Sequence, residues 1–297
     1  MKPHQIAIFS ILFGASLFAL TLSAQQKKQP ASQSKLHEIG TLPAVVPEAS
    51  GLQIDSQKKL WTHNDGGVPA LYSIDTSGKL IRTIQLNANN AGWEDLAKDK
   101  SGNFYVGGFG DNYNQKKEFK IYKIPDPAGI QEEIVNPEVI HYQYSDRETK
   151  NGKHHDMDAM TIFRDSIFLF TKKPNHQGYI HVYRLPCTPG NYTAALTDSI
   201  NVGGTDMQYW ITGAEISRDE KYILLLSHDK LFILYNFKNT KLSRGKQKII
   251  SLGHFSHKAG VCFYEPGKIF IVDELEFILG GKLYSLDLTP ELQKLSL

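Results

Sequence analysis

Acidic side chains stand at both ends of a short predicted β-hairpin. The stretch GWEDLAKDKSGNFYVGGFGDN, residues 92–112, holds two apolar segments suited to strands, with the turn DKSGN between them. Trp93 and Glu94 begin the first strand, and Asp111 follows the second. Because the strands of a hairpin run antiparallel, these polar ends lie at the same edge of the sheet. These polar groups either stabilise turns or form the rim of a functional site.

Similar polar clusters recur at the corresponding strand ends along the chain. Carboxylate and amide oxygens without cysteine are the ligands of a hard cation such as calcium or magnesium. Each residue alone suits an ordinary turn or cap, but like charges around one axis need a counter-ion or hydrogen bonds. We therefore expect a divalent cation, with calcium first, and the candidate ligands are Glu48, Asn64, Glu94, Asp111, Asp158 and Asp273.

Histidines, lysines and tryptophans at the same strand ends are candidates for ligand binding and catalysis. Histidine and a carboxylate can act as general base and acid, lysines can neutralise an anion, and tryptophans can stack on a sugar or pack between sheets. The candidate catalytic residues are Asp158, His155 and His228. The candidate ligand-binding residues are His63, Trp93, Asn112, Lys172, Lys173 and Trp210. The chain has no HExxH, CxxC, GxSxG, P-loop or dinucleotide motif.

A repeat predicts the elements that position these residues. A strand of the form apolar-Tyr-x-apolar follows a predicted hairpin five times, at residues 71–75, 121–124, 182–185, 234–237 and 283–287. The first four are followed by a fourth strand, and LHEIGTLP, residues 36–43, can supply the missing one. Four-stranded repeats of this kind predict an all-β, five-bladed β-propeller (six blades are possible) closed by an N-terminal strand. A pair of β-sandwiches is the structural alternative, but it does not explain the repeated tyrosine strand.

The N-terminus predicts export. A short basic start, an apolar run to Ala24 and small residues at its end indicate a signal peptide over residues 1–24. Residues 25–35 are polar and predict a flexible leader, and residues 36–297 form a single propeller domain. A retained membrane anchor is the minor alternative. We expect a secreted or periplasmic protein with no stable membrane span after cleavage.

Composition limits the partners. The formal net charge is +2, and no basic patch suggests nucleic-acid binding. Cys187 and Cys262 are the two cysteines, and the repeat places them on blades that are not neighbours. We therefore expect free thiols.

Several short segments of the sequence resemble those of a group of uncharacterised secreted bacterial β-propellers. These are EASGL, LWTHNDGG, LYSID, WEDLAKD, GDN, DMDAM, ITGAEIS and KIFIVDE. The chain resembles SdiA-regulated and esterase-like-phytase propellers and, more loosely, NHL and gluconolactonase-type propellers. The resemblance implies a propeller fold and calcium at the channel mouth. The chain departs from it at Ala259, where an acid is usual, and at Asp158, which replaces Glu.

Two functions follow. In the first, the chain is a binding module that holds a small-molecule or extracellular ligand, anionic because of Lys172 and Lys173, at the channel mouth. In the second, it is a metal-dependent hydrolase of a phosphoester, ester or lactone, in which a cation activates water. The absence of a recognisable nucleophile favours binding.

Overall fold

A computed structural model describes residues 32–33, 36–146 and 155–296. The predicted signal peptide, most of the leader, Arg147 and His154 lie outside the described residues. Among the helices of the described part, none has the length and apolar character needed to cross a bilayer.

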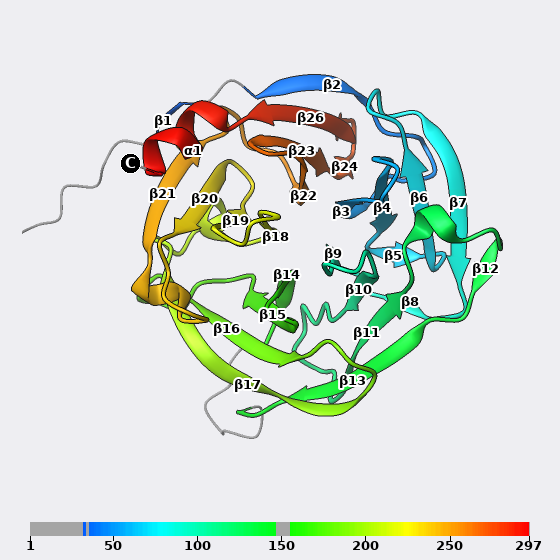
Figure 1. The fold of residues 1–297 in the computed structure, drawn as a ribbon, viewed down its shortest axis with the longest axis horizontal. Helices are drawn as coiled ribbons and strands as arrows, with labels where there is room; N and C mark the ends of the chain where they lie inside the picture. Colours follow the sequence, from blue (N-terminus) through cyan, green and yellow to red (C-terminus); the bar gives the residue numbers. More distant parts are fainter. Residues whose placement is uncertain (1–31, 34–35, 147–154, 297) are drawn as a thin grey trace, which may run out of the picture. The chain divides into compact units, whose positions relative to one another are not determined.

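Three sheets repeat one plan, in which successive strands lie side by side and antiparallel (Figure 1). The first contains β3 (Ala49–Ile54), β4 (Leu60–Asn64), β6 (Ala70–Ile74) and β7 (Leu80–Leu86). The second contains β18 (Gly213–Ile216), β19 (Tyr222–Leu226), β20 (Lys230–Tyr235) and β21 (Lys246–Ser251). The third contains β22 (Lys258–Glu265), β23 (Lys268–Asp273), β26 (Lys282–Asp287) and β2 (His37–Thr41).

The fourth sheet joins two such arrays. Its strand order is β14 (Met157–Phe163), β15 (Ser166–Thr171), β16 (Tyr179–Pro186), β17 (Gly190–Asn201), β13 (Glu138–Tyr144), β11 (Phe119–Ile124), β10 (Phe104–Gly108) and β9 (Asp95–Lys98). The join is parallel, with Ile140 of β13 opposite Gly190 of β17. The remainder of β17 pairs antiparallel with β16. The sequence predicted only the end of this strand, DSINV at residues 198–202, because the first half of β17 pairs with β13, which is distant in sequence.

Short elements complete the described chain. The outer edges of two sheets carry β1 (Ser32–Gln33) and β12 (Ile134–Val135). The loops contain two small ribbons, β5 (Gly66–Gly67) with β8 (Asn90–Ala91) and β24 (Leu275–Glu276) with β25 (Leu279–Gly280). The helical segments are the 3₁₀ turns η1 (Pro127–Gly129), η2 (Met207–Tyr209) and η3 (Leu242–Arg244), and α1 (Thr289–Leu295).

The inner strands close into a ring. In order around it, β3 contacts β9, β9 contacts β14, β14 contacts β18, β18 contacts β22, and β22 returns to β3. The N-terminal strand β2 lies beside β26, with His37 opposite Ser285, as the sequence predicted. The radial arrangement in Figure 1 agrees with the predicted all-β propeller architecture.

Glycine and one buried carboxylate hold the inner strands close together. A Cβ at Gly260 would lie only 2.6 Å from the carbonyl carbon of Gly51. Asp95 of β9 accepts hydrogen bonds from the backbone N–H groups of Met160 in β14 (2.7 Å) and Ala214 in β18 (3.1 Å). This carboxylate therefore ties three inner strands together.

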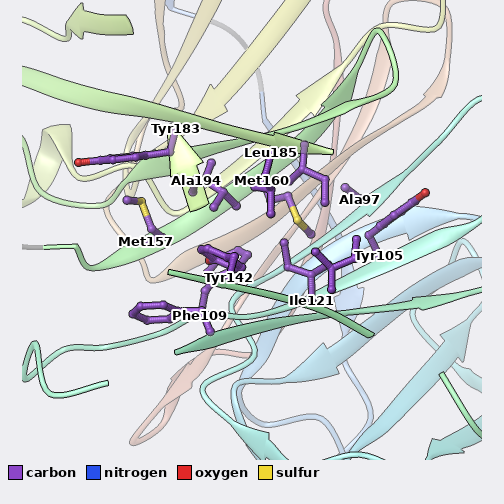
Figure 2. Packing of buried hydrophobic residues seen from close by; sticks show 14 of the residues in the cluster. Ala97, Tyr105, Phe109, Ile121, Tyr142, Met157, Met160, Tyr183, Leu185 and Ala194 are labelled. Atoms are coloured by element: carbon purple, nitrogen blue, oxygen red, sulfur yellow. The ribbon is translucent and has the colours of Figure 1, made fainter. Parts of the chain in front are cut away.

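Apolar side chains from neighbouring arrays interdigitate between the sheets. Figure 2 shows Ala97, Tyr105 and Ile121 from one half of the eight-stranded sheet against Met160 and Leu185 from the other. These side chains are buried, and their removal from water is the main favourable contribution to folding. Both cysteines are buried free thiols, which confirms the sequence prediction.

Candidate functional site

The predicted polar strand ends meet at one end of the ring, which we call the mouth. Inner strands begin there and second strands end there. At Gly110, the residue before Asp111, an added Cβ would collide with the carboxylate of Glu94. The two ends of the 92–112 hairpin are therefore in contact, as the antiparallel pairing predicts.

A lysine lies among the carboxylates of the mouth. Lys172, directly after β15, places its Nζ 2.5 Å from Asp158 Oδ2, and both side chains are largely buried. Burial alone would lower the pKa of Lys172, but the charges of Asp158, Glu94 and Asp156 raise it above the ordinary value. Lys172 is therefore a built-in counter-ion.

The carboxylates of the mouth are too crowded to ionise easily. Burial, together with the charges of Asp158 and Asp65, raises the pKa of Glu94 well above its ordinary value. Burial raises the pKa of Asp158 to about 6, although Lys172 opposes the shift. Burial and the charge of Asp65 raise the pKa of Glu274 to about 8. Each shift reports a cost of placing one more negative charge here.

Asp65 belongs to the same group. Burial and the neighbouring charge of Glu48 raise its pKa, and Lys172 and Lys116 oppose the shift. The described carboxylates that influence one another's pKa at the mouth number six, and they are Glu48, Asp65, Glu94, Asp156, Asp158 and Glu274. The lysines that act on or pair with them in the described chain are Lys116, Lys172 and Lys173.

Buried oxygen atoms in this group lack hydrogen-bond partners among the described residues. They are both carboxylate oxygens of Asp156 and Oδ1 of Asp158. Asp156 is only 1% exposed, and its Oδ2 lies 3.6 Å from Lys173 Nζ, beyond hydrogen-bond distance. Lys173 in turn lies over the ring of Trp210, 4.8 Å from its centroid. A buried carboxylate oxygen without a donor is costly unless a donor or cation arrives.

A pocket of about 330 Å³ opens beside Glu94 and Asp65. Its other lining residues include Asp111, Asn112, Tyr113 and Lys116. The pocket therefore joins the acidic group to the surface.

The opposite side of the mouth carries histidines. His228 is 3% exposed, and neither ring nitrogen has a hydrogen-bond partner in the described chain. Burial and the charges of His257 and Lys172 lower its pKa to about 4, so the ring is neutral. It packs beside Phe255 and His257, and His257 Nδ1 lies 3.2 Å from Glu274 Oε2.

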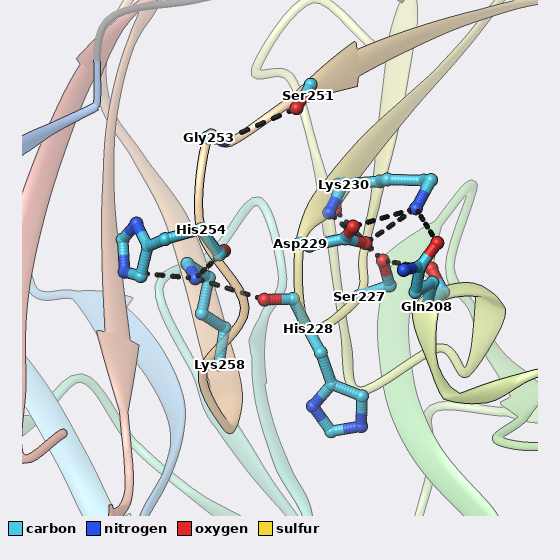
Figure 3. Close-up of polar contacts among 9 residues, drawn as sticks. All are labelled: Gln208, Ser227, His228, Asp229, Lys230, Ser251, Gly253, His254 and Lys258. Carbon is cyan, nitrogen blue, oxygen red and sulfur yellow. Dashed lines mark hydrogen bonds and ion pairs between the residues drawn. The ribbon is translucent and has the colours of Figure 1, made fainter. Parts of the chain in front are cut away.

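Figure 3 shows how the backbone behind His228 is fixed. Nζ of Lys258 donates to the carbonyl oxygens of His228 and His254, each at 3.0 Å, and to Ser256 Oγ at 2.9 Å. Lys258 is fully buried, and burial lowers its pKa to about 8. The ring of His228 points away from these contacts.

Several predicted metal ligands already accept hydrogen bonds that stabilise the fold. Asp111 Oδ1 accepts from the backbone N–H of Gln115 at 2.7 Å, which is turn chemistry. Asn64 Oδ1 accepts from the backbone N–H of Glu48, and its Nδ2 donates to the Val45 carbonyl. Both oxygens of Asp273 are also used, by the Lys282 N–H and the Tyr284 hydroxyl.

Other predicted residues lie in the packed interior. Trp93 is fully buried and makes an edge contact with His63, whose pKa burial lowers to about 4. His155 stacks on Tyr144, with ring centroids 4.6 Å apart, and its Nε2 lies 2.8 Å from Asp146 Oδ1. These positions leave Glu94, Asp158, Lys172, Lys173, Trp210 and His228 as the predicted residues that gather at the mouth, with Glu48 and Asn112 at its edge.

The donor set does not match a metal site. Within the described residues, no three His, Cys, Asp or Glu side chains converge closely enough to hold one ion. The ammonium of Lys172 already lies against Asp158. The six predicted ligands are thus divided between the mouth and the backbone contacts described above.

Sequence reasoning did not select Asp65, Asp156 or Glu274 as site residues. Each is the direct neighbour of a selected residue, and alternation along a strand sends adjacent side chains to opposite sides. The pairing of strand ends could have identified all three residues, because each lies at a strand terminus on the mouth side.

No protein-family profile matches the chain, and no curated protein is similar to it in sequence. Among solved structures, the PQQ-bound aldose sugar dehydrogenase of Streptomyces coelicolor is 10% identical, with a TM-score of 0.48, over 87% of this chain and 99% of that one. Regucalcin of Agrobacterium tumefaciens, described as a calcium-binding protein, is 10% identical, with a TM-score of 0.48, over 87% of this chain and 95% of that one.

The WD40 β-propeller domain of Doa1 is 11% identical, with a TM-score of 0.37, over 84% of this chain and 71% of that one. Similarity of this degree does not transfer a function from one protein to another. The resemblance to SdiA-regulated and esterase-like-phytase propellers stays a prediction.

Proposed function

We propose that the chain is an exported, five-bladed β-propeller whose mouth binds a positively charged ligand. The eight-stranded sheet counts as two blades, because the parallel join of β13 and β17 links two arrays that each begin at their own inner strand. With the other three sheets this gives five blades. Release of residues 1–24 would be checked by the N-terminal sequence of the protein recovered after export.

One observation carries the ligand proposal: the carboxylates of the mouth, three of them buried, outnumber the lysines near them. Six carboxylates face three lysines in the described mouth, and the unpartnered oxygens of Asp156 and Asp158 add unused acceptor capacity. A bound cation removes the repulsion and supplies the missing donors.

The same balance favours a cation over the anion expected from Lys172 and Lys173. Both lysines are paired with carboxylates, Lys172 with Asp158 and Lys173 with Asp156. An anion would have to break these pairs and approach the remaining negative charge.

An organic ammonium or guanidinium group fits the mouth better than calcium does. The contact between Lys172 and Asp158 is itself an ammonium–carboxylate pair in this environment. Calcium takes six to eight oxygens in one shell. That shell would require Lys172 to withdraw and the carboxylates to converge.

Calorimetric titration of the purified chain tests the proposal. The probes are lysine methyl ester, arginine methyl ester, calcium chloride and sodium phosphate. We expect the two esters to bind, and Glu94→Gln to weaken them about tenfold, roughly 1.4 kcal/mol. Glu265→Gln is the control, because Glu265 ends β22, at the opposite end from the mouth, and pairs with Lys58. Binding of phosphate alone would contradict the proposal, and binding of calcium alone would assign a metal site.

The affinity should also depend on pH in a defined direction. Cation binding requires ionised carboxylates, and the pKa values of Asp158 and Glu274 are about 6 and about 8. Affinity for arginine methyl ester should therefore rise from pH 5.5 to pH 8.5. A flat profile would show that these carboxylates do not contact the ligand.

A hydrolase remains the second candidate, favoured by the raised pKa of Asp158. A carboxyl group with a pKa of about 6 can exchange protons near neutral pH, and the neutral, unpartnered ring of His228 lies across the mouth. Generic phosphoester and ester substrates test this reading. Turnover that disappears in both Asp158→Ala and Glu94→Ala would favour a hydrolase.

A further inference from the structure

An apolar hairpin projects beside the mouth. Its strands β24 and β25 pair through Leu275 and Gly280, and its tip contains Phe277 and Ile278. Phe277 is 101% exposed, Ile278 is 90% exposed and Leu279 is 74% exposed. Exposed large apolar side chains in one short element indicate an interaction site rather than a packing role.

The base of the hairpin is part of the acidic mouth. Glu274 immediately precedes β24, and Glu276 lies within it. Both carboxylates hold His257, with Glu274 Oε2 at 3.2 Å and Glu276 Oε1 at 3.1 Å from Nδ1. The backbone N–H of Leu275 donates to the Pro47 carbonyl at 2.7 Å, next to Glu48. The hairpin therefore stands at a fixed place on the rim.

Further exposed aromatic side chains lie around the same rim. Phe255 is about half exposed and packs against the ring of His228. Tyr113 is 83% exposed and lines the pocket that contains Glu94 and Asp65. Apolar side chains thus surround a group with excess negative charge.

We propose that this face docks a polypeptide segment that carries lysine or arginine flanked by apolar residues. The basic side chain enters the pocket that Glu94 and Asp65 line, and its charge offsets those of the adjacent Asp156 and Asp158. The flanking residues cover Phe277, Ile278 and Leu279. The inference rests on the proposed cation site and names its partner.

Charge selects this occupant over two others. An anionic membrane would bring negative headgroups toward Glu274 and Glu276, and a second copy would bring a second acidic mouth. A basic segment instead pairs with the carboxylates while its apolar residues leave water.

Fluorescence anisotropy with labelled decapeptides tests the proposal. The peptides alternate leucine with lysine, leucine with glutamate, and serine with lysine. We expect the leucine–lysine peptide to bind at least about tenfold more tightly than either of the others. The double variant Phe277→Ser/Ile278→Ser should weaken it by the same factor and leave binding of lysine methyl ester unchanged. Leu80→Ser/Ile81→Ser, at exposed positions on the outer strand β7, is the matched control.

The outcomes separate the two proposals. If lysine methyl ester binds but the leucine–lysine and serine–lysine peptides bind equally, the docking proposal fails and the cation site stands. If no cation binds, the cation site itself fails. Co-sedimentation with phosphatidylcholine–phosphatidylserine vesicles, lost in the hairpin variant, would overturn the docking proposal in favour of a membrane. Self-association lost in that variant would overturn it in favour of a second copy.

Discussion

At the scale of single residues, Lys172 supplies the positive charge that the sequence analysis assigned to a metal ion. The sequence predicted that crowded carboxylates need a counter-ion, and it placed Lys172 at the mouth. It could not show which side chain reaches Asp158, because that depends on the separation of two neighbouring strands rather than on residue type.

Replacement of this counter-ion should make stability strongly dependent on pH. Lys172→Met leaves Asp158 and Glu94 buried without their nearest positive charge. Breaking a buried pair from one side costs about 3–5 kcal/mol. The loss should be large at pH 8 and small at pH 5, where the carboxyl groups are protonated. Thermal unfolding at the two pH values checks this, and equal losses would show that Lys172 acts through packing.

Glu215 predicts a second pH effect, away from the mouth. It is buried on β18, its Oε2 accepts from Gln53 Nε2 at 2.9 Å, and burial raises its pKa to about 7. Between its ordinary pKa of 4.5 and this value, the folded state binds more protons than the unfolded state. Its contribution to stability is therefore complete below pH 4.5 and is lost as the pH rises through 7.

Glu215→Gln should remove that loss. Glutamine keeps the shape and an acceptor for Gln53 but carries no charge. We expect the variant to be more stable than the parent at pH 8 by up to about 3 kcal/mol, and similar to it at pH 4.5. Urea unfolding at both pH values measures the difference. A variant that is less stable at pH 8 would show that the charge of Glu215 is satisfied by its neighbours.

The choice between adjacent residues marks the limit of sequence reasoning at this scale. The sequence analysis selected Asp273 and not Glu274, but Asp273 accepts hydrogen bonds from Lys282 and Tyr284 while Glu274 lies at the mouth. For Asp111, the sequence left two roles open, a turn or the rim of a site. The structure shows both, because the carboxylate accepts a hydrogen bond within a turn and the residue also lines the pocket. Which of two adjacent side chains faces the mouth depends on how their strand pairs with its neighbour, and the sequence does not give that pairing.

At the scale of elements, the inner strands approach each other through glycine. A Cβ at Gly260 in β22 would lie 2.6 Å from the Gly51 carbonyl carbon, and most of that contact is backbone that cannot rotate away. Gly260→Ala should therefore destabilise the fold by about 1–3 kcal/mol through overpacking. Gly129→Ala is the matched control, because nothing lies within 4 Å of a Cβ there. Equal stability of the two variants would show that the ring can expand locally.

Strand identity was the most predictable property of the elements. The repeated tyrosine strands correspond to β6, β11, β16, β20 and β26, since alternation and turn residues are local signals. The parallel pairing of β13 with β17 was not predictable, because the pattern of either strand fits an exposed edge equally well.

At the scale of the whole molecule, the ring depends on a strand from the far end of the chain. β2 pairs antiparallel with β26, and Leu42, just after β2, is buried in the core with Leu283 and Val272. Without β2, the edge of β26 would expose unpaired backbone groups, which promote association with other chains. The side chains of β2 are mostly exposed, so its contribution is chiefly backbone pairing and the anchoring of Leu42.

Removal of this closing strand gives the last prediction. A chain that begins at Leu42 should unfold at a lower temperature than a chain that begins at Leu36, which keeps β2 and also lacks β1. It should also sediment as dimers or larger species, because β26 becomes an open edge. A peptide of residues 36–43 added in excess should restore the melting temperature and the sedimentation of the longer chain, since closure then depends on peptide concentration. If both chains melt and sediment alike, the other inter-sheet contacts suffice to close the ring, and β2 only covers its edge.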